Sequence, residues 1–318
     1  MSLRDLFSTP SPDVAVEIDH AHVAAARLEV RGDQRVIVAH ASEALPAGLV
    51  TPGLAAANIT DVPQVSQAVG RALAQLGGSK PSRVALVVPD TVAKVSLLRL
   101  EKVPAKAADL QEIVKWQVRK TAPFPIDQAV VSIAPGALSA DGAEEFVVAL
   151  SRADVIHQYE QACLMAGVHA GLVDLSTFSV INSVVGSTAA PPGDWLLVHV
   201  TASYMTLAVI RNNSLLFFRN RGDEADGTLA DLIHQTAMYY EDRLHGGGFT
   251  RVLIAGAASL PGGADSVRRG LVDRLGMTVD AVDPRTAAML QDRIGASPEL
   301  LDTLAPLVGL LVRERRAA

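Results

Sequence analysis

An internal duplication is the feature of this sequence that most constrains its fold. Each copy reads as three strands joined by short turns, then a helix, then a continuous apolar run typical of a strand buried on both faces. In the first copy these segments lie at 14–18, 23–30, 35–41, 61–76 and 83–89. In the second they lie at 195–201, 204–211, 215–221, 228–244 and 251–257. The repeated order predicts two related α/β halves.

The two copies differ in what they carry in addition. After the strand at 83–89, a block at about 92–150 reads as a strand, an amphipathic helix and two strands, which predicts a small inserted αβ subdomain. In the second copy, one helix separates the strand that ends near Arg221 from the strand that starts near Arg251. We therefore expect the lid of the second half to be reduced or missing. The predicted organisation is an arm at 1–12, a first half at 13–186, a linker at 187–194 and a second half at 195–318.

Composition excludes several classes of function. The net charge is −6, so no basic excess is available to neutralise nucleic-acid phosphates. The single cysteine, Cys163, rules out disulfides within the chain and favours a reducing compartment. The sequence shows no signal peptide, and the apolar run at 304–312 is too short to span a bilayer. We therefore expect a cytoplasmic protein with no transmembrane segment and no nucleic-acid partner.

Several motifs resemble those of the PilM family, the actin-like proteins of type IV pilus assembly. They are VALVVPDTVAKVSLLRLEKVP at 84–104, LQEIVKWQVRKTAPFPIDQAVVSI at 110–133, RVLIAGAASLPGG at 251–263 and the late LAPLVGLLVRE. The resemblance implies the actin-like (ASKHA) fold, in which two α/β halves enclose a nucleotide cleft. It also implies the short N-terminal tail of a PilN-like inner-membrane protein as partner, and contact with pilus motor ATPases.

The positions that hold ATP and magnesium in actin-like proteins have drifted in this chain. On the first hairpin, the acidic position falls on Glu17, the phosphate-facing glycine on Asp19 and the lysine on Ala24. On the second hairpin, the corresponding positions are His199 and Thr201, and the adenosine loop keeps one glycine, Gly256. An acid beneath the phosphates repels them, and glycine is what lets backbone N–H groups approach. We expect a degenerate cleft with no cofactor, the alternative being an ATPase with atypical loops.

The histidines suggest a further alternative, a metal site. His20 and His22 would share one face of a strand, and closure of an actin-like cleft would bring His199 near them. Three imidazoles suit zinc, and an open fourth position would permit metal-assisted hydrolysis. We favour the simpler interpretation that these are exposed turn histidines beside a cleft. We also expect Asp174 to cap the helix that starts near Ser176.

The segment Pro123, Phe124, Pro125 is the candidate for partner binding. Its two prolines predict a rigid turn that anchors the preceding helix, and Phe124 could also line a groove for an extended peptide. Trp116 is expected to pack in the same small core.

The resemblance, together with the altered nucleotide positions, implies a non-enzymatic adaptor at the cytoplasmic face of the inner membrane that binds the tail of a PilN-like protein. The alternatives are the atypical ATPase, the metal-site enzyme and a cytoplasmic component of a type II secretion platform.

Overall fold

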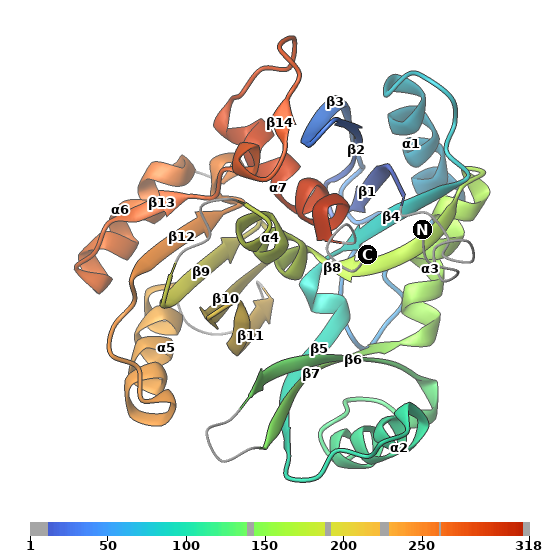
Figure 1. The fold of residues 1–318 in the computed structure, drawn as a ribbon. Helices are drawn as coiled ribbons and strands as arrows, with labels where there is room; N and C mark the ends of the chain where they lie inside the picture. The colour runs from blue at the N-terminus through green and yellow to red at the C-terminus, as the bar shows by residue number, and fades with distance from the viewer. Residues whose placement is uncertain (1–11, 139–142, 188–191, 223–228, 261, 314–318) are drawn as a thin grey trace.

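Three β-sheets organise the molecule. The computed structural model describes residues 12–138, 143–187, 192–222, 229–260 and 262–313. Two larger sheets stand side by side, and a smaller third sheet lies below them in the view of Figure 1. Residues 1–11 of the predicted arm and residues 188–191 of the predicted linker at 187–194 lie outside the described residues, and β9 already begins at Asp194.

The first sheet has six strands in the order β14-β3-β2-β1-β4-β8. β1, β2 and β3 form an antiparallel meander, and β4 and β8 continue parallel to β1. The bounds are β1 Val14–Ile18, β2 His22–Arg31, β3 Gln34–Ala44, β4 Arg83–Val88, β8 His169–Leu175 and β14 Met289–Leu290.

Helices α1 (Val62–Gln75) and α3 (Ala153–Met165) cover one face of this sheet. The alternation on β1 decides the faces, because Val14, Val16 and Ile18 pack with these helices while Ala15 points to the opposite side. Asp61 begins α1 as predicted, accepting a hydrogen bond from the backbone N–H of Gln64 at 3.0 Å.

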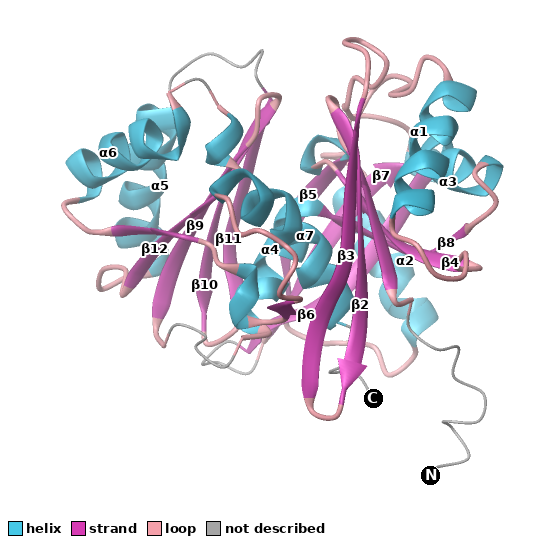
Figure 2. Cartoon of the chain, turned by 90° about the horizontal axis from the view of Figure 1, so that it is seen from above, coloured by secondary structure: helices cyan, strands magenta, loops and turns pink. Residues whose placement is uncertain are grey.

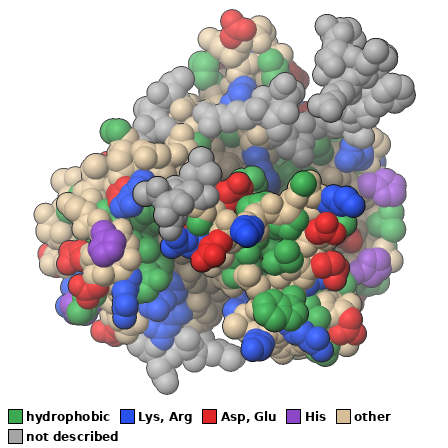
Figure 3. All heavy atoms as spheres, turned by 60° about the horizontal axis from the view of Figure 1, so that its bottom comes forward, with side chains coloured by type: hydrophobic (Ala, Val, Ile, Leu, Met, Phe, Trp, Pro, Cys, Tyr) green, Lys and Arg blue, Asp and Glu red, His purple; other side chains and the backbone are tan. Residues whose placement is uncertain are grey.

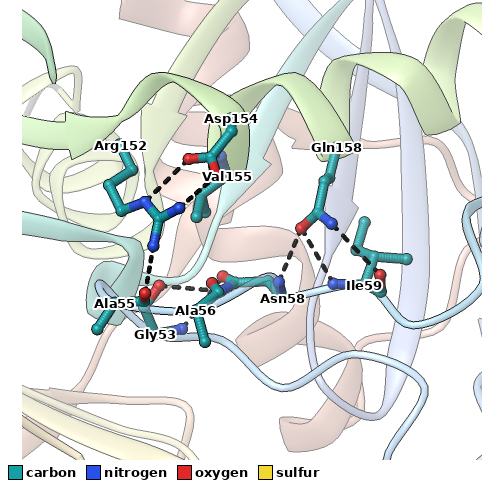
Figure 4. A network of polar contacts seen from close by, with 9 residues as sticks. All are labelled: Gly53, Ala55, Ala56, Asn58, Ile59, Arg152, Asp154, Val155 and Gln158. Atoms are coloured by element: carbon teal, nitrogen blue, oxygen red, sulfur yellow. Dashed lines mark hydrogen bonds and ion pairs between the residues drawn. The ribbon is translucent and has the colours of Figure 1, made fainter. Parts of the chain in front are cut away.

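A buried asparagine attaches the loop before α1 to α3 (Figure 4). The Asn58 side chain donates to the carbonyls of Gly53 and Ala56, while its backbone N–H donates to Gln158 Oε1 at 2.7 Å. Arg152, at the end of β7, donates to the carbonyl of Ala55 and pairs with Asp154. The loop is therefore held to the start of α3 and to the end of the inserted subdomain.

The second sheet repeats this topology, with the order β11-β10-β9-β12-β13. Its meander closes on Asn212 and Asn213, both at positive φ, as the predicted hairpin turn requires. The bounds are β9 Asp194–Val200, β10 Tyr204–Arg211, β11 Ser214–Gly222, β12 Arg251–Ala255 and β13 Val279–Ala281. The outer face is covered by α5 (Leu229–Leu244) and α6 (Gly263–Leu275). Between β11 and β12, where we predicted a reduced or missing lid, the described residues form one helix, α5, and residues 223–228 lie outside them.

Two helices, α4 (Ser176–Val185) and α7 (Pro298–Arg313), lie between the two large sheets (Figures 1 and 2). α7 packs Leu304, Leu307 and Leu311 against the first sheet and Ala305 against the second. The helices touch at Gly309, where a Cβ would lie 1.6 Å from the carbonyl oxygen of Ser179. Any side chain at 309 would thus force the helices apart.

The end of the chain departs from the predicted division into halves. We expected 195–318 to form the second half, yet β14 pairs with β3 and α7 covers the first sheet. This range therefore contributes to both sheets. The reason is packing: the first sheet's second face is lined by small residues, Ala15, Ala24, Ala26 and Ala85, which need an apolar helix to cover them.

The inserted block folds as a three-stranded antiparallel sheet in the order β5-β7-β6, with α2 on one face. The bounds are β5 Ala93–Leu100, α2 Ala107–Val118, β6 Ala129–Leu138 and β7 Glu144–Arg152. The prediction for Trp116 is wrong: the residue is 71% exposed, because Val114 and Val118 are the α2 residues that turn inward. On the side of the molecule seen in Figure 3, basic and acidic side chains are interspersed over the described surface.

Gly309→Ala tests the contact between α4 and α7. The added methyl group overlaps the backbone of Ser179, so we expect the free energy of unfolding to fall by about 2–4 kcal/mol. Gly270→Ala on α6 is the matched control, since a Cβ there meets nothing within 4 Å. That change should be neutral or stabilise by about 0.5–1 kcal/mol. Equal effects of the two variants in urea denaturation would contradict the packing argument.

Candidate functional site

A cavity of about 380 Å³ lies where the two halves meet. It is lined by the β1–β2 turn, the β9–β10 turn, the residue after β12 and the first turns of α7. All five residues predicted for the degenerate cleft line it: Glu17, Asp19, His199, Thr201 and Gly256. The fold therefore brings together residues that are up to 239 positions apart in numbering, from Glu17 to Gly256.

Two buried acids stand at the end of β1. Glu17 accepts a hydrogen bond from Ser176 Oγ at 3.1 Å, and burial, with the nearby charge of Asp19, raises its pKa to about 8. Burial also acts to raise the pKa of Asp19, but the hydrogen bond from His20 Nδ1 at 3.1 Å and its charge outweigh this and lower it. At neutral pH, Asp19 is thus ionised and Glu17 is mostly protonated.

Two more acids, which the sequence reasoning missed, enter from α7. Glu299 and Asp302 lie in its first turns and line the cavity. Asp302 Oδ2 accepts a hydrogen bond from the Ala258 N–H at 2.8 Å, yet burial raises the pKa of this carboxyl overall. Their i, i+3 spacing puts both side chains on one face of α7. The sequence of the helix does not show which surface that face will pack against. Among the described lining residues there is no lysine or arginine.

Gly256 and Thr201 have structural roles at the cavity wall. Gly256 has φ of 79°, and a Cβ there would lie 2.3 Å from the carbonyl oxygen of Val200. The Thr201 hydroxyl accepts hydrogen bonds from the N–H groups of Ser203 (3.2 Å) and Tyr204 (3.1 Å), which closes the β9–β10 turn. The glycine is required by close backbone packing, and the hydroxyl is occupied by its own turn.

A buried polar network joins the halves behind the cavity. Asp90, fully buried after β4, accepts from the N–H of Thr177 at 2.9 Å, from its hydroxyl, and from Thr206 Oγ1 at 2.6 Å. His199 Nδ1 lies 2.7 Å from Thr177 Oγ1. Because the Thr177 hydroxyl gives its hydrogen to Asp90, Nδ1 carries the hydrogen of that bond. Burial lowers the pKa of His199, so the ring is neutral at pH 7.

The cap of α4 is therefore Asp90, and the prediction that Asp174 caps this helix is wrong. Asp174 accepts from the backbone N–H of Leu175, the residue before the first turn, and pairs with Arg313 at the end of α7. The sequence cannot show that Asp90 takes this role, because Asp90 is 87 positions from Thr177. Only the folded sheet brings the two residues together.

The three histidines line the same cavity, but each is engaged with a different neighbour. The expectation that they are exposed turn residues is wrong for His199, which is buried on β9. His20 bonds to Asp19, His22 Nε2 lies 3.9 Å from Glu17 Oε2, and His199 is engaged with Thr177. Among the described residues, no group of three or more His, Cys, Asp or Glu side chains is arranged to hold a metal ion.

A second candidate site is an apolar groove beneath the first sheet. It consists of two adjoining hollows of about 200 Å³ each that share Ala134, Val147, Asp174, Phe178 and Arg313. One wall is the face of the inserted sheet that α2 leaves uncovered, with Val130, Ser132 and Ala134 of β6. The other wall is β8 and the first turn of α4. β6 and β8 are both end strands in the order of their sheets.

The predicted partner-binding residues lie on the other side of the inserted sheet. Phe124 is partly buried in the core beneath α2, with Val114 and Val118, while Pro123 and Pro125 are exposed. None of the three lines the groove. Their placement matches the structural role considered for this turn, and the groove is lined mainly by β6, β7, β8 and α4.

Glu17→Gln gives a pH-dependent prediction. Because the folded-state pKa of about 8 exceeds the unfolded value of 4.5, the folded chain holds the extra proton between these values and loses stability as pH rises through them. Glutamine cannot ionise, so we expect the variant to gain about 2–4 kcal/mol over the wild type between about pH 5 and about pH 8.5. Chemical denaturation at both pH values measures this. A difference that stays constant with pH would contradict the buried, protonated Glu17.

The chain matches the family model "Type IV pilus assembly protein PilM" over residues 15–242. Its structure resembles that of a PilM–PilN type IV pilus biogenesis complex, with a TM-score of 0.77 and 19% identity over 96% of this chain and 99% of that chain. A Bacteroides thetaiotaomicron protein with an actin-like ATPase fold and unknown function matches with a TM-score of 0.46 and 8% identity, over 84% of this chain and 89% of that one.

The cytoplasmic domain of EpsL, from the type II secretion system of Vibrio cholerae, matches with a TM-score of 0.46 and 10% identity, over 96% and 94% of the two chains. A search among curated proteins returned no match.

Within the described residues, no helix is long and apolar enough to cross a membrane. Since the family model covers more than half of the chain, the chain belongs to the PilM family of type IV pilus assembly proteins.

Proposed function

We propose that this chain is a non-enzymatic adaptor of type IV pilus assembly at the cytoplasmic face of the inner membrane. It binds the N-terminal tail of a PilN-like membrane protein in the apolar groove, and through that partner it connects to the motor ATPases. Family membership supports the pilus role, and the structural match to a PilM–PilN complex supports the partner.

The observation that carries the proposal is the pair of strand edges beside the groove. β6 ends the inserted sheet and β8 ends the first sheet, so each offers unpaired backbone donors and acceptors to an extended peptide. Small side chains on β6 and β7, Ala134, Ala149 and Ser151, leave room for the larger side chains of a ligand. Because ordering a flexible tail costs entropy, affinity is modest in solution and is raised by co-localisation at the membrane.

The cleft supports the non-enzymatic part of the proposal. ATP with magnesium needs backbone N–H groups and cations around its phosphates. The cavity instead presents Asp19, Glu299 and Asp302, and Gly256 serves backbone packing. The charges nearest the former phosphate position therefore repel a nucleotide.

ATP with magnesium should not bind. Isothermal titration of the purified chain is expected to show no saturable heat. Asp19→Gly is expected to leave this unchanged, since the second hairpin still offers His199 and Thr201 to a phosphate. Saturable micromolar binding by the wild type would establish the atypical ATPase instead.

Val130→Asp should abolish peptide binding. Val130 lines the groove and is 47% exposed, so a charge is tolerated by the fold but opposes an apolar ligand. We expect affinity for a synthetic N-terminal peptide of the PilN-like protein from the same genome to fall by about tenfold or more. Fluorescence anisotropy measures it.

The matched control is Val30→Asp, on β2 away from the groove and 48% exposed, which should bind normally. Phe124→Ala should lower the Tm through the α2 core while the folded fraction keeps its affinity. Unchanged peptide binding by a folded Val130→Asp variant would remove the groove from the interface. A loss of peptide affinity in folded Phe124→Ala would instead place the turn at 123–125 in the interface.

A further inference from the structure

The apolar groove continues beyond the first half of the molecule. Its two hollows are continuous, because they share five lining residues. The first hollow is lined by the first half and the inserted subdomain, together with Arg313 of α7. The second hollow is also lined by the β10–β11 hairpin of the second half, with Ile210, Asn213, Ser214 and Leu215. The groove therefore reaches from one half to the other.

Strand β6 leads from the first hollow to the second. Val130 and Ser132 line the first hollow, Ala134 lines both, and Pro135 lines the second. A peptide paired with the free edge of β6 over residues 130–135 would extend about 17 Å, at the usual rise per residue of a strand, and would enter the second hollow. Pro135 has no backbone N–H, so β6 offers no donor at that position and the peptide needs other partners beyond it.

The second hollow offers such partners. Ile181 of α4 lies with Ile210 and Leu215 in its apolar wall. Asn182 on α4 and Asn213 on the hairpin also line the hollow, and neither side-chain amide has a hydrogen-bond partner among the described residues. A carboxamide has both donors and an acceptor, as the peptide backbone does. The hollow thus suits an apolar side chain flanked by peptide groups.

We propose that the β10–β11 hairpin completes the peptide site, so that the tail of the PilN-like partner lies along β6 and binds both halves of the molecule. Since the ligand is the tail named in the proposed function, this second subsite rests on that function. The tail places an apolar side chain in the second hollow, and its peptide groups bond to Asn182 and Asn213. The hairpin is held beside the first hollow because Phe218 of β11 packs against Phe178, with ring centroids 5.1 Å apart.

Asn213→Gly tests the second subsite in the full chain, with Asn212→Gly as the matched control. Both asparagines are exposed turn residues at positive φ, which glycine adopts without strain, so both variants should fold. Of the two, Asn213 alone lines the hollow. In the anisotropy assay with the N-terminal peptide of the PilN-like protein, Asn213→Gly should weaken binding by about three- to tenfold through lost hydrogen bonds. Asn212→Gly should bind as the wild type does.

A fluorescent label gives a second readout of the same subsite. Cys163, the single cysteine of the chain, is fully buried, so a thiol-reactive and environment-sensitive dye labels the introduced thiol of Asn213→Cys or Asn212→Cys. We expect the peptide to change the emission saturably in Asn213→Cys and not in Asn212→Cys. If the peptide binds the unmodified chain but the two positions behave alike in both assays, the second subsite is overturned and the adaptor proposal stands. If the peptide does not bind the unmodified chain, the subsite and the proposed function fail together.

Discussion

The contact between α4 and α7 at Gly309 holds the rest of this structure in place. Without a side chain at 309, the two helix backbones meet, so that α7 covers the first sheet while α4, with Ala305 of α7, covers the second. The alanines of β1, β2 and β4 that face α7 allow the same closeness on the first sheet. Because the first turns of α7 also form a wall of the cavity, this contact sets the geometry of the cleft.

Behind the cleft, the hydrogen bonds of Asp90 form a second connection between the two halves. A fully buried carboxylate is costly unless its oxygens are satisfied, and here one backbone N–H and two hydroxyls donate to it. The donors come from α4 and from β10, so the acid links the first half to the second. The fold thus keeps a buried polar link between the halves directly behind the cavity that Asp19, Glu299 and Asp302 line.

The first turn of α4 lies between the two candidate sites. Ser176 bonds to Glu17 in the cleft, Thr177 bonds to Asp90, and Phe178 lines the apolar groove. Three consecutive residues thereby contact the cleft, the buried network and the groove. The arrangement follows from helical geometry, in which successive side chains point about 100° apart.

The sequence by itself determined the local elements and the repeat. The apolar alternation of β1, the Asp61 cap and the Asn212–Asn213 turn act over a few residues, so their physics is complete in the sequence. The positions of Glu17, Asp19, His199, Thr201 and Gly256 in one cleft followed from the resemblance, which supplies the tertiary pairing. Only the tertiary structure decided that α7 crosses to the first sheet and brings Glu299 and Asp302 into the cleft. It also decided that Trp116 faces outward, that Phe124 packs beneath α2, and that Asp90 caps α4 in place of Asp174. In each case the deciding partner is distant in sequence, and a helix pattern shows which face is apolar but not which surface that face will cover.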